Sequence, residues 1–101
     1  MTDGSIAVEN NEAAQRFEVL VDGLLSLLTY ERRGDRIVFT HTEVPAALEG
    51  RGIASVLART ALDDARARQL QVVPLCPFVR GYIERHPEHR ALVSAHASPE
   101  A

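Results

Sequence analysis

Hydrophobic residues recur at every second position in the first third of the chain, which is typical of strands with one buried face. Phe17, Val19 and Val21 follow this pattern, and Asp22-Gly23 comes directly after them. This dipeptide is preferred in two-residue hairpin turns, because its positive backbone angles match the twist of the strands. Residues 24–30 are then apolar on both faces. They predict a central strand that is covered on both sides.

Residues 36–44 continue the predicted sheet. Four residues of this segment recur at every second position and are expected to share one face: Ile37, Phe39, His41 and Glu43. Pro45 cannot donate a ladder hydrogen bond, which predicts the end of the strand there. A weaker pattern suggests a short strand over residues 6–9. Together these segments predict an antiparallel meander.

The second half of the chain has a helical period. A helix that packs on the sheet is predicted over residues 50–68 by an apolar stripe: Ile53, Val56, Leu57, Ala61 and Ala65. Residues 71–76 predict a short buried strand, which a right-handed parallel crossover would join to the strand before the helix. A second helix is expected over residues 77–86. Pro87 can begin a last short helix that runs through about residue 93.

The size and composition of the chain limit how many cores it can form. Its 101 residues are 46% hydrophobic and 25% charged, which predicts one small domain with a single core. We expect this core over residues 6–93 and a flexible tail over residues 94–101. The predicted fold class is α/β, with a mixed sheet built from an antiparallel meander and one parallel β-α-β crossover.

Charge and cysteine content exclude several classes of protein. The formal net charge is −3 and the arginines are scattered, so the chain lacks the dense basic face that binds nucleic acid. One cysteine excludes an internal disulfide and a multi-thiolate metal site, and it suits a reducing compartment. No segment has the pattern of a secretion signal or a membrane span. These features predict a cytoplasmic protein that binds neither nucleic acid nor membranes.

A glycine-rich turn, in the sequence VPAALEGRGIAS, precedes the first predicted helix. Glycines allow backbone N–H groups to approach a phosphate, and a helix N-terminus adds a partial positive charge. The turn would therefore suit a pyrophosphate. Glycine is also ordinary turn punctuation, and the motif alone favours that plainer interpretation. The spacing excludes a P-loop, and the third glycine of a dinucleotide fingerprint is absent.

His41 and Glu43 are candidate bases near the C-terminal end of their strand, where open sheets tend to bind ligands. His41 could accept a proton from an amine or a thiol, because the pKa of histidine is usually near neutrality. The plainer alternative is a histidine at the edge of the core and a solvated carboxylate. The pair alone favours that alternative.

Cys76 lies between an apolar strand and Pro77. A free cysteine is usually a small buried hydrophobe. Pro77, however, suits the first turn of a helix, whose positive end would favour a thiolate. From these residues alone the two interpretations are balanced. The nearby His86, Glu88 and His89 do not predict a metal site, because a proline breaks their geometry.

Three motifs in this order resemble those of the GNAT N-acetyltransferases, and more closely the short, YjdJ-type GNAT-like family. They are the strand HTEVP, the turn GRG and the segment CPFVRGYIERHPEH. The resemblance covers about residues 16–93. It implies a minimal GNAT acyl-CoA N-acyltransferase fold, acetyl-CoA as cofactor and an amine as acceptor.

The resemblance also implies roles for particular residues. The backbone that ends at Val44 would pair with the pantetheine arm of the cofactor. The pyrophosphate loop would be formed by Glu49, Gly50, Arg51, Gly52, Ile53 and Ala54. A Gln or Arg that the family usually has before the loop is Ala47 here, and Arg51 would compensate by pairing with a phosphate. Cys76 takes the place of the family's asparagine and would face the cofactor or act as a catalytic thiol.

Two departures from the family bear on catalysis. The family has a general-acid tyrosine seven residues after the Cys76 position, where this chain has Ile83. Tyr82 points about 100° away around the helix and is expected to pack. The two helices that usually follow the first strand have no room before Arg16. The acceptor side is therefore expected to be open, which favours a peptide, polyamine or protein acceptor.

These observations favour an N-acetyltransferase in which His41 or Glu43 takes a proton from the ammonium group of the acceptor. Cys76 would line the cofactor site or, in a second route, carry the acetyl group. The alternative is a CoA-binding or protein-interaction module of the same fold without transferase activity. We expect a monomer or a weak homodimer.

Overall fold

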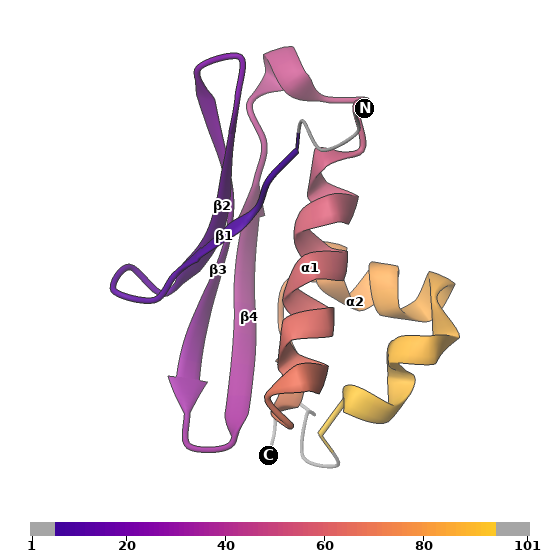
Figure 1. The fold of residues 1–101 in the computed structure, drawn as a ribbon. Helices are drawn as coiled ribbons and strands as arrows, with labels where there is room; N and C mark the ends of the chain where they lie inside the picture. The colour runs from indigo at the N-terminus through magenta and orange to yellow at the C-terminus, as the bar shows by residue number, and fades with distance from the viewer. Residues whose placement is uncertain (1–5, 95–101) are drawn as a thin grey trace.

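The protein is built on a five-stranded sheet, and both of its described α-helices pack on one face of that sheet (Figure 1). The computed structural model describes residues 6–94. The strands are β1 (Glu9–Asn11), β2 (Arg16–Val21), β3 (Leu24–Arg33), β4 (Arg36–Glu43) and β5 (Gln71–Pro74). The helices are η2 (Ala46–Leu48), α1 (Ile53–Ala67), α2 (Pro77–Arg85) and η3 (Pro87–Leu92).

The strands lie in chain order across the sheet. Pairing is antiparallel from β1 to β4, and β4 pairs with β5 in parallel across the α1 crossover. The predicted α/β fold class, a meander followed by one parallel crossover, is therefore confirmed. The first strand differs from its prediction, because it spans Glu9–Asn11 instead of residues 6–9.

The β2–β3 hairpin has the predicted two-residue turn. Val21 pairs with Leu24, and the turn residues Asp22 and Gly23 have φ angles of 54° and 77°. Positive φ at both positions is typical of the turn that suits the right-handed twist of hairpin strands. The local sequence thus sets the register of the first half of the sheet.

The core lies between the sheet and α1. Phe17, Leu28 and Phe39 from the strands pack in one cluster with Leu57 and Leu62 of α1, and all five are almost completely buried. Burying a side chain of this size contributes about 1.5–3 kcal/mol. This cluster fixes the sheet against the helical layer.

The opposite face of β3 is not covered as predicted. Leu25 and Leu27 alternate with the core residues of β3 and are only half-buried. Their cross-strand neighbours are Leu20 and Glu18, and both described α-helices lie on the other side of the sheet (Figure 1). The prediction of a strand covered on both sides is therefore wrong, because the apolar run is shielded by neighbouring strands instead of a second layer.

A bulge in β4 reverses which residues face the core. Thr29 pairs with His41 but Tyr30 pairs with Phe39, so Thr40 is an extra residue on β4. The hydroxyl groups of Thr29 and Thr40 are hydrogen bonded at 2.7 Å, which holds the extra residue in place. One inserted residue moves all later side chains to the other face. His41 therefore lies opposite the core, and the prediction that it shares a face with Phe39 is wrong.

The same reversal applies to Glu43, which is exposed, whereas Ile37 is buried on the helical side. At the other edge of the sheet, Val93 forms an isolated bridge with Val72, and the Ser94 N–H donates to the Val72 carbonyl at 2.9 Å. Ser94, which was predicted to begin the tail, is therefore hydrogen bonded to the edge strand β5. The rest of that tail, residues 95–101, lies outside the described residues. No helix within residues 6–94 is long and apolar enough to cross a membrane.

Candidate functional site

A cavity of about 220 Å³ lies between the end of β4, the glycine turn and the start of α2. Its lining includes all the predicted cofactor residues except Arg51 and Cys76. The lining residues are Val44, Leu48, Glu49, Gly50, Gly52, Ile53, Ala54, Ser55 and Phe78. Residues of the segment 44–55 and Phe78, which are far apart in the sequence, thus line the same cavity.

The glycine turn gives this cavity a positive end. Gly50 and Gly52 have φ angles of 88° and 77°, in the left-handed region that other residues adopt only with strain. Gly52 is the N-cap of α1, no side chain caps the helix, and its first turn has no acidic residue. The first N–H of α1 with an intrahelical acceptor is that of Val56, which donates to the Gly52 carbonyl. The free N–H groups and the helix dipole together suit an anion such as a phosphate.

Arg51 does not line the cavity. Its guanidinium Nη1 lies 2.8 Å from Asp22 Oδ2, at the tip of the β2–β3 hairpin. The side chains of Arg51 and Asp22 are 51% and 63% exposed, so the ion pair is screened and easily exchanged. The structure therefore gives Arg51 a protein partner in place of the expected phosphate.

Cys76 lies where β4 and β5 separate. The last paired residues are Phe39 and Pro74, and residues 40–43 of β4 continue beyond β5. The Cys76 N–H donates to the Phe39 carbonyl at 2.9 Å, and Cys76 Sγ is hydrogen bonded to Thr42 Oγ1 at 3.1 Å. The thiol is 3% exposed. It therefore bridges β4 and the N-terminus of α2 at the point of separation.

His41 and Glu43 lie on the other side of the sheet from Cys76. Thr42, the hydrogen-bond partner of Cys76, pairs with the buried Leu28, whereas His41 and Glu43 alternate with it and are exposed. No hydrogen bond between described residues joins either of them to Cys76. The three predicted catalytic residues therefore form two separate groups, a buried thiol and an exposed histidine–carboxylate pair.

Tyr82 is a packing residue, as expected. It is 5% exposed and its ring stacks on that of His86, with centroids 3.9 Å apart. Ile83, at the position of the family's tyrosine, is also buried. Within residues 6–94, no group of three or more histidine, cysteine, aspartate or glutamate residues is arranged to hold a metal ion.

Three lining residues were not predicted from the sequence: Leu48, Ser55 and Phe78. Phe78 follows the proline that begins α2, and this proline fixes where the first turn starts. The sequence could have identified Phe78 as a lining residue, because Pro77 fixes the start of α2 and the first turn of α2 faces the glycine turn. Leu48 carried no comparable signal, since its burial depends on the short helix η2.

Comparisons with known proteins bear on the family and the fold of the chain. A family model described as GCN5-related N-acetyl-transferase matches residues 16–92. Protein NATD1 of Mus musculus is 39% identical over 87 residues, which cover 83% of this chain and 79% of the mouse protein. Protein NATD1 of Gallus gallus is 39% identical over 85 residues, or 81% and 77% of the two chains. The solution structure of a GCN5-like protein from Staphylococcus aureus superposes with a TM-score of 0.69 at 21% identity, covering 93% of this chain and 96% of that one.

Proposed function

The chain belongs to the GCN5-related N-acetyltransferase family, and on this premise we propose that it binds acetyl-CoA and transfers the acetyl group to an amine. The observation that carries the proposal is the cavity that joins Val44 to the glycine turn. The cavity has a polar end for the diphosphate of CoA and an apolar part for its pantetheine arm. Backbone N–H groups lie at the α1 end, and apolar side chains such as Leu48 and Phe78 line the rest.

Residues of the glycine turn would hold the diphosphate of CoA. The N–H groups of Ile53, Ala54 and Ser55 have no intrahelical acceptors and would donate to phosphate oxygens. Val44 and the end of β4 that extends beyond β5 would hold the pantetheine arm. When bound, acetyl-CoA supplies a thioester carbonyl that an amine can attack.

The exposed pair on β4 would handle the proton of the acceptor. An alkyl amine is protonated at neutral pH and cannot attack until it loses a proton. His41 or Glu43 can accept this proton, because both side chains are exposed on the uncovered face of the sheet. A backbone N–H near Val44 would polarise the carbonyl. The chain would thus act as a base and a carbonyl-polarising scaffold.

A second route passes through an acetylated Cys76. The observation that favours it is the position of the thiol, at the separation of β4 and β5 and 3.1 Å from Thr42 Oγ1. We rank it below direct transfer, because an amine attacks a thioester without a covalent relay. In addition, His41 and Glu43 lie on the opposite face and do not contact the thiol that they would have to activate.

Turnover with a panel of primary amines tests the proposed activity. The release of CoA thiol from acetyl-CoA should depend on the amine and should rise with pH as the acceptor loses its proton. Ala substitution of both His41 and Glu43 should lower kcat, by about 10²–10⁴-fold if they supply the base. Hydrolysis alone, or no release with any amine, would favour the alternative of a CoA-binding module without transferase activity.

Intact mass after incubation with acetyl-CoA separates the two routes. Direct transfer predicts that Cys76→Ala keeps its turnover within about tenfold of the wild type, since the thiol only lines the site. A Cys76-dependent acetyl adduct in the wild type, with loss of turnover in Cys76→Ala, would establish the covalent route instead. Thr42→Val is the matched control, because it removes the hydrogen bond to the thiol but keeps the nucleophile.

A further inference from the structure

One face of the sheet has no α-helix over it within residues 6–94. Both α1 and α2 lie on the side of Phe17 and Leu28 (Figure 1). The other face presents the side chains that alternate with these core residues. Among them, the large hydrophobic side chain of Leu20 is 65% exposed. No α-helix of residues 6–94 therefore shields Leu20 from solvent.

A row of side chains crosses this face from β4 to β1. Glu43 pairs with Leu27, Leu27 pairs with Glu18, and Glu18 pairs with Glu9. Because neighbouring strands lie roughly 4.8 Å apart, the row is roughly 14 Å long. Glu43 and Glu9 stand at its two ends, with the apolar Leu27 and then Glu18 between them. The row begins beside the proposed base and leads away from the point where β4 and β5 separate.

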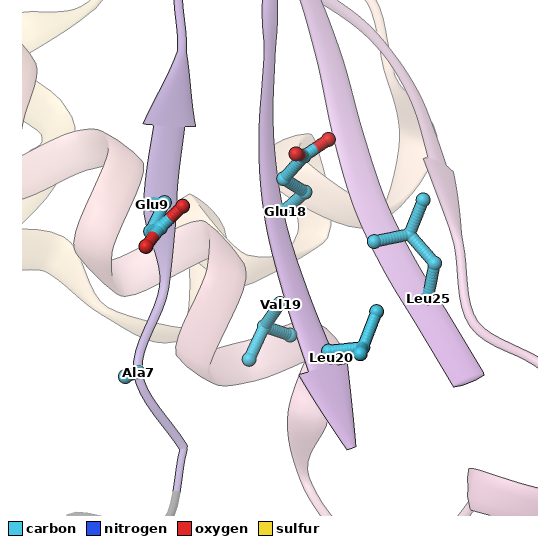
Figure 2. A pocket seen from close by; sticks show the side chains of 6 residues that line it. All are labelled: Ala7, Glu9, Glu18, Val19, Leu20 and Leu25. Carbon is cyan, nitrogen blue, oxygen red and sulfur yellow. The ribbon is translucent and has the colours of Figure 1, made fainter. Parts of the chain in front are cut away.

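The far end of the row borders a hollow of about 250 Å³. Ala7, Glu9, Glu18, Val19, Leu20 and Leu25 line it. Figure 2 shows Glu9 on one strand and Glu18 on the next, with Leu20 and Leu25 side by side. Carboxylates on one side and aliphatic side chains on the other suit an ammonium group attached to methylene carbons.

Of the three carboxylates in the row, only Glu18 has a positively charged partner among the described residues. Arg16 Nε lies 2.5 Å from Glu18 Oε2, and this hydrogen bond holds the pKa of Glu18 below its ordinary value. Asn11 also donates to Glu18, at 3.2 Å. Neither Glu9 nor Glu43 forms an ion pair with another described residue. Glu9 stands directly opposite Glu18, where like charges repel, and the Arg16 ion pair is formed by Glu18 and not by Glu9.

We infer that this uncovered face binds the acceptor, and that the acceptor is a linear polyamine with one ammonium group at Glu43 and another in the hollow at Glu9. The inference rests on the proposed acetyl transfer. The two end carboxylates have no ion-pair partner among the described residues, and between them lie Leu27 and Glu18, which Arg16 already neutralises. This arrangement matches two cations separated by methylene segments. The row runs across the strands and the hollow is small, which suits an extended small molecule better than a peptide segment.

The reaction at the Glu43 end balances as an acyl transfer. The terminal ammonium gives one proton to His41 or Glu43, and the free amine then forms a C–N bond as the C–S bond of the thioester breaks. The second proton of the attacking nitrogen goes to the CoA sulfur. The proton on the base passes to solvent, so one proton is released for each acetyl group transferred.

A titration of the whole chain with spermine, followed by NMR without acetyl-CoA, tests this surface. Spermine should shift the amide signals of Glu9, Glu18, Leu27 and Glu43, and butylamine, with one ammonium, should shift them far less at equal concentration. Glu9→Gln should weaken spermine binding roughly two- to fivefold at low salt, as expected for one exposed charge pair. Glu84→Gln, which removes an exposed charge from α2, is the matched control and should leave spermine binding unchanged.

Several results would overturn this inference. Spermine binding without shifts of these signals would contradict the proposed surface. An equal loss of binding in Glu84→Gln and Glu9→Gln would show that long-range charge alone attracts spermine. If a lysine-containing peptide shifts these amide signals and spermine does not, the acceptor bound at this face is a peptide and not a polyamine. Binding of CoA is measured separately. Spermine bound at this face without CoA binding would contradict the proposed transfer but keep the surface, and the reverse result would contradict only the surface.

Discussion

Arg51 has one anionic partner in the structure and a second one in the proposed complex with CoA. One is Asp22, which it contacts at 2.8 Å, and the other is the phosphate that we place at the glycine turn. The turn itself was predictable, because the positive φ angles at Gly50 and Gly52 favour glycine over residues with a side chain. The Asp22 contact was not, since it joins residues 29 positions apart through a hairpin whose place above the turn depends on the whole sheet.

Asp22→Asn should therefore change CoA affinity through Arg51. Asparagine fits the positive φ of this turn, so the hairpin should persist while Arg51 loses its anionic partner. We expect CoA to bind up to about fivefold more tightly, the amount that an exposed ion pair of up to ~1 kcal/mol allows. Calorimetric titration at low and high salt measures the change. If Asp22→Asn has the same effect in the presence of Arg51→Gln, Arg51 is not the residue involved.

At the scale of the elements, β4 is the one strand whose internal register the sequence did not predict. The hairpin, both helices and the parallel crossover follow from turn residues and hydrophobic period. The bulge at Thr40 does not, because the alternation from Ile37 to Glu43 continues through it without a break. The bulge arises from pairing with β3, and it moves His41 and Glu43 away from Cys76. The candidate bases were therefore identifiable by residue type but not by the face on which they act.

The short strand β1 is tied to the sheet by Tyr30. Its hydroxyl donates to Asn10 Oδ1 at 2.6 Å, and burial, followed by the charge of Glu12, raises the pKa of Tyr30 above its ordinary 10.0. The neutral phenol is thus favoured in the folded state. Its contribution to the free energy of unfolding should be complete below pH 10.0 and should be lost as the pH rises from there through the raised pKa.

Tyr30→Phe should remove most of this alkaline loss and, at neutral pH, lower the free energy of unfolding by about 1 kcal/mol for the missing hydrogen bond. Urea unfolding across the pH range measures both effects. Tyr82→Phe, which leaves the Tyr30–Asn10 bond in place, serves as the control and should keep the alkaline loss. An alkaline loss in Tyr30→Phe as large as in the wild type would assign it to another group.

On the scale of the whole molecule, the sheet divides the site into two sides. The helical side holds the cavity, the glycine turn and the buried Cys76, and the uncovered side holds His41, Glu43 and the hollow at Glu9. The β4 end beyond β5 is where the two sides meet. Family motifs in the sequence predicted the cofactor side, whereas the acceptor side depends on strand register and was predictable only as an opening.

The binding of acetyl-CoA at the glycine turn is the central claim, and the melting temperature tests it directly. Ligand at ~100 times its Kd contributes ~2.7 kcal/mol, which should raise the Tm of a domain of this size by roughly 10–20 °C. Gly52→Glu puts a carboxylate at the anion site and should abolish this rise. Gly34→Glu introduces similar backbone strain, at φ 64° in the β3–β4 turn at the far end of the sheet, and should keep it. No rise in the wild type, or an equal rise in both variants, would contradict the assignment.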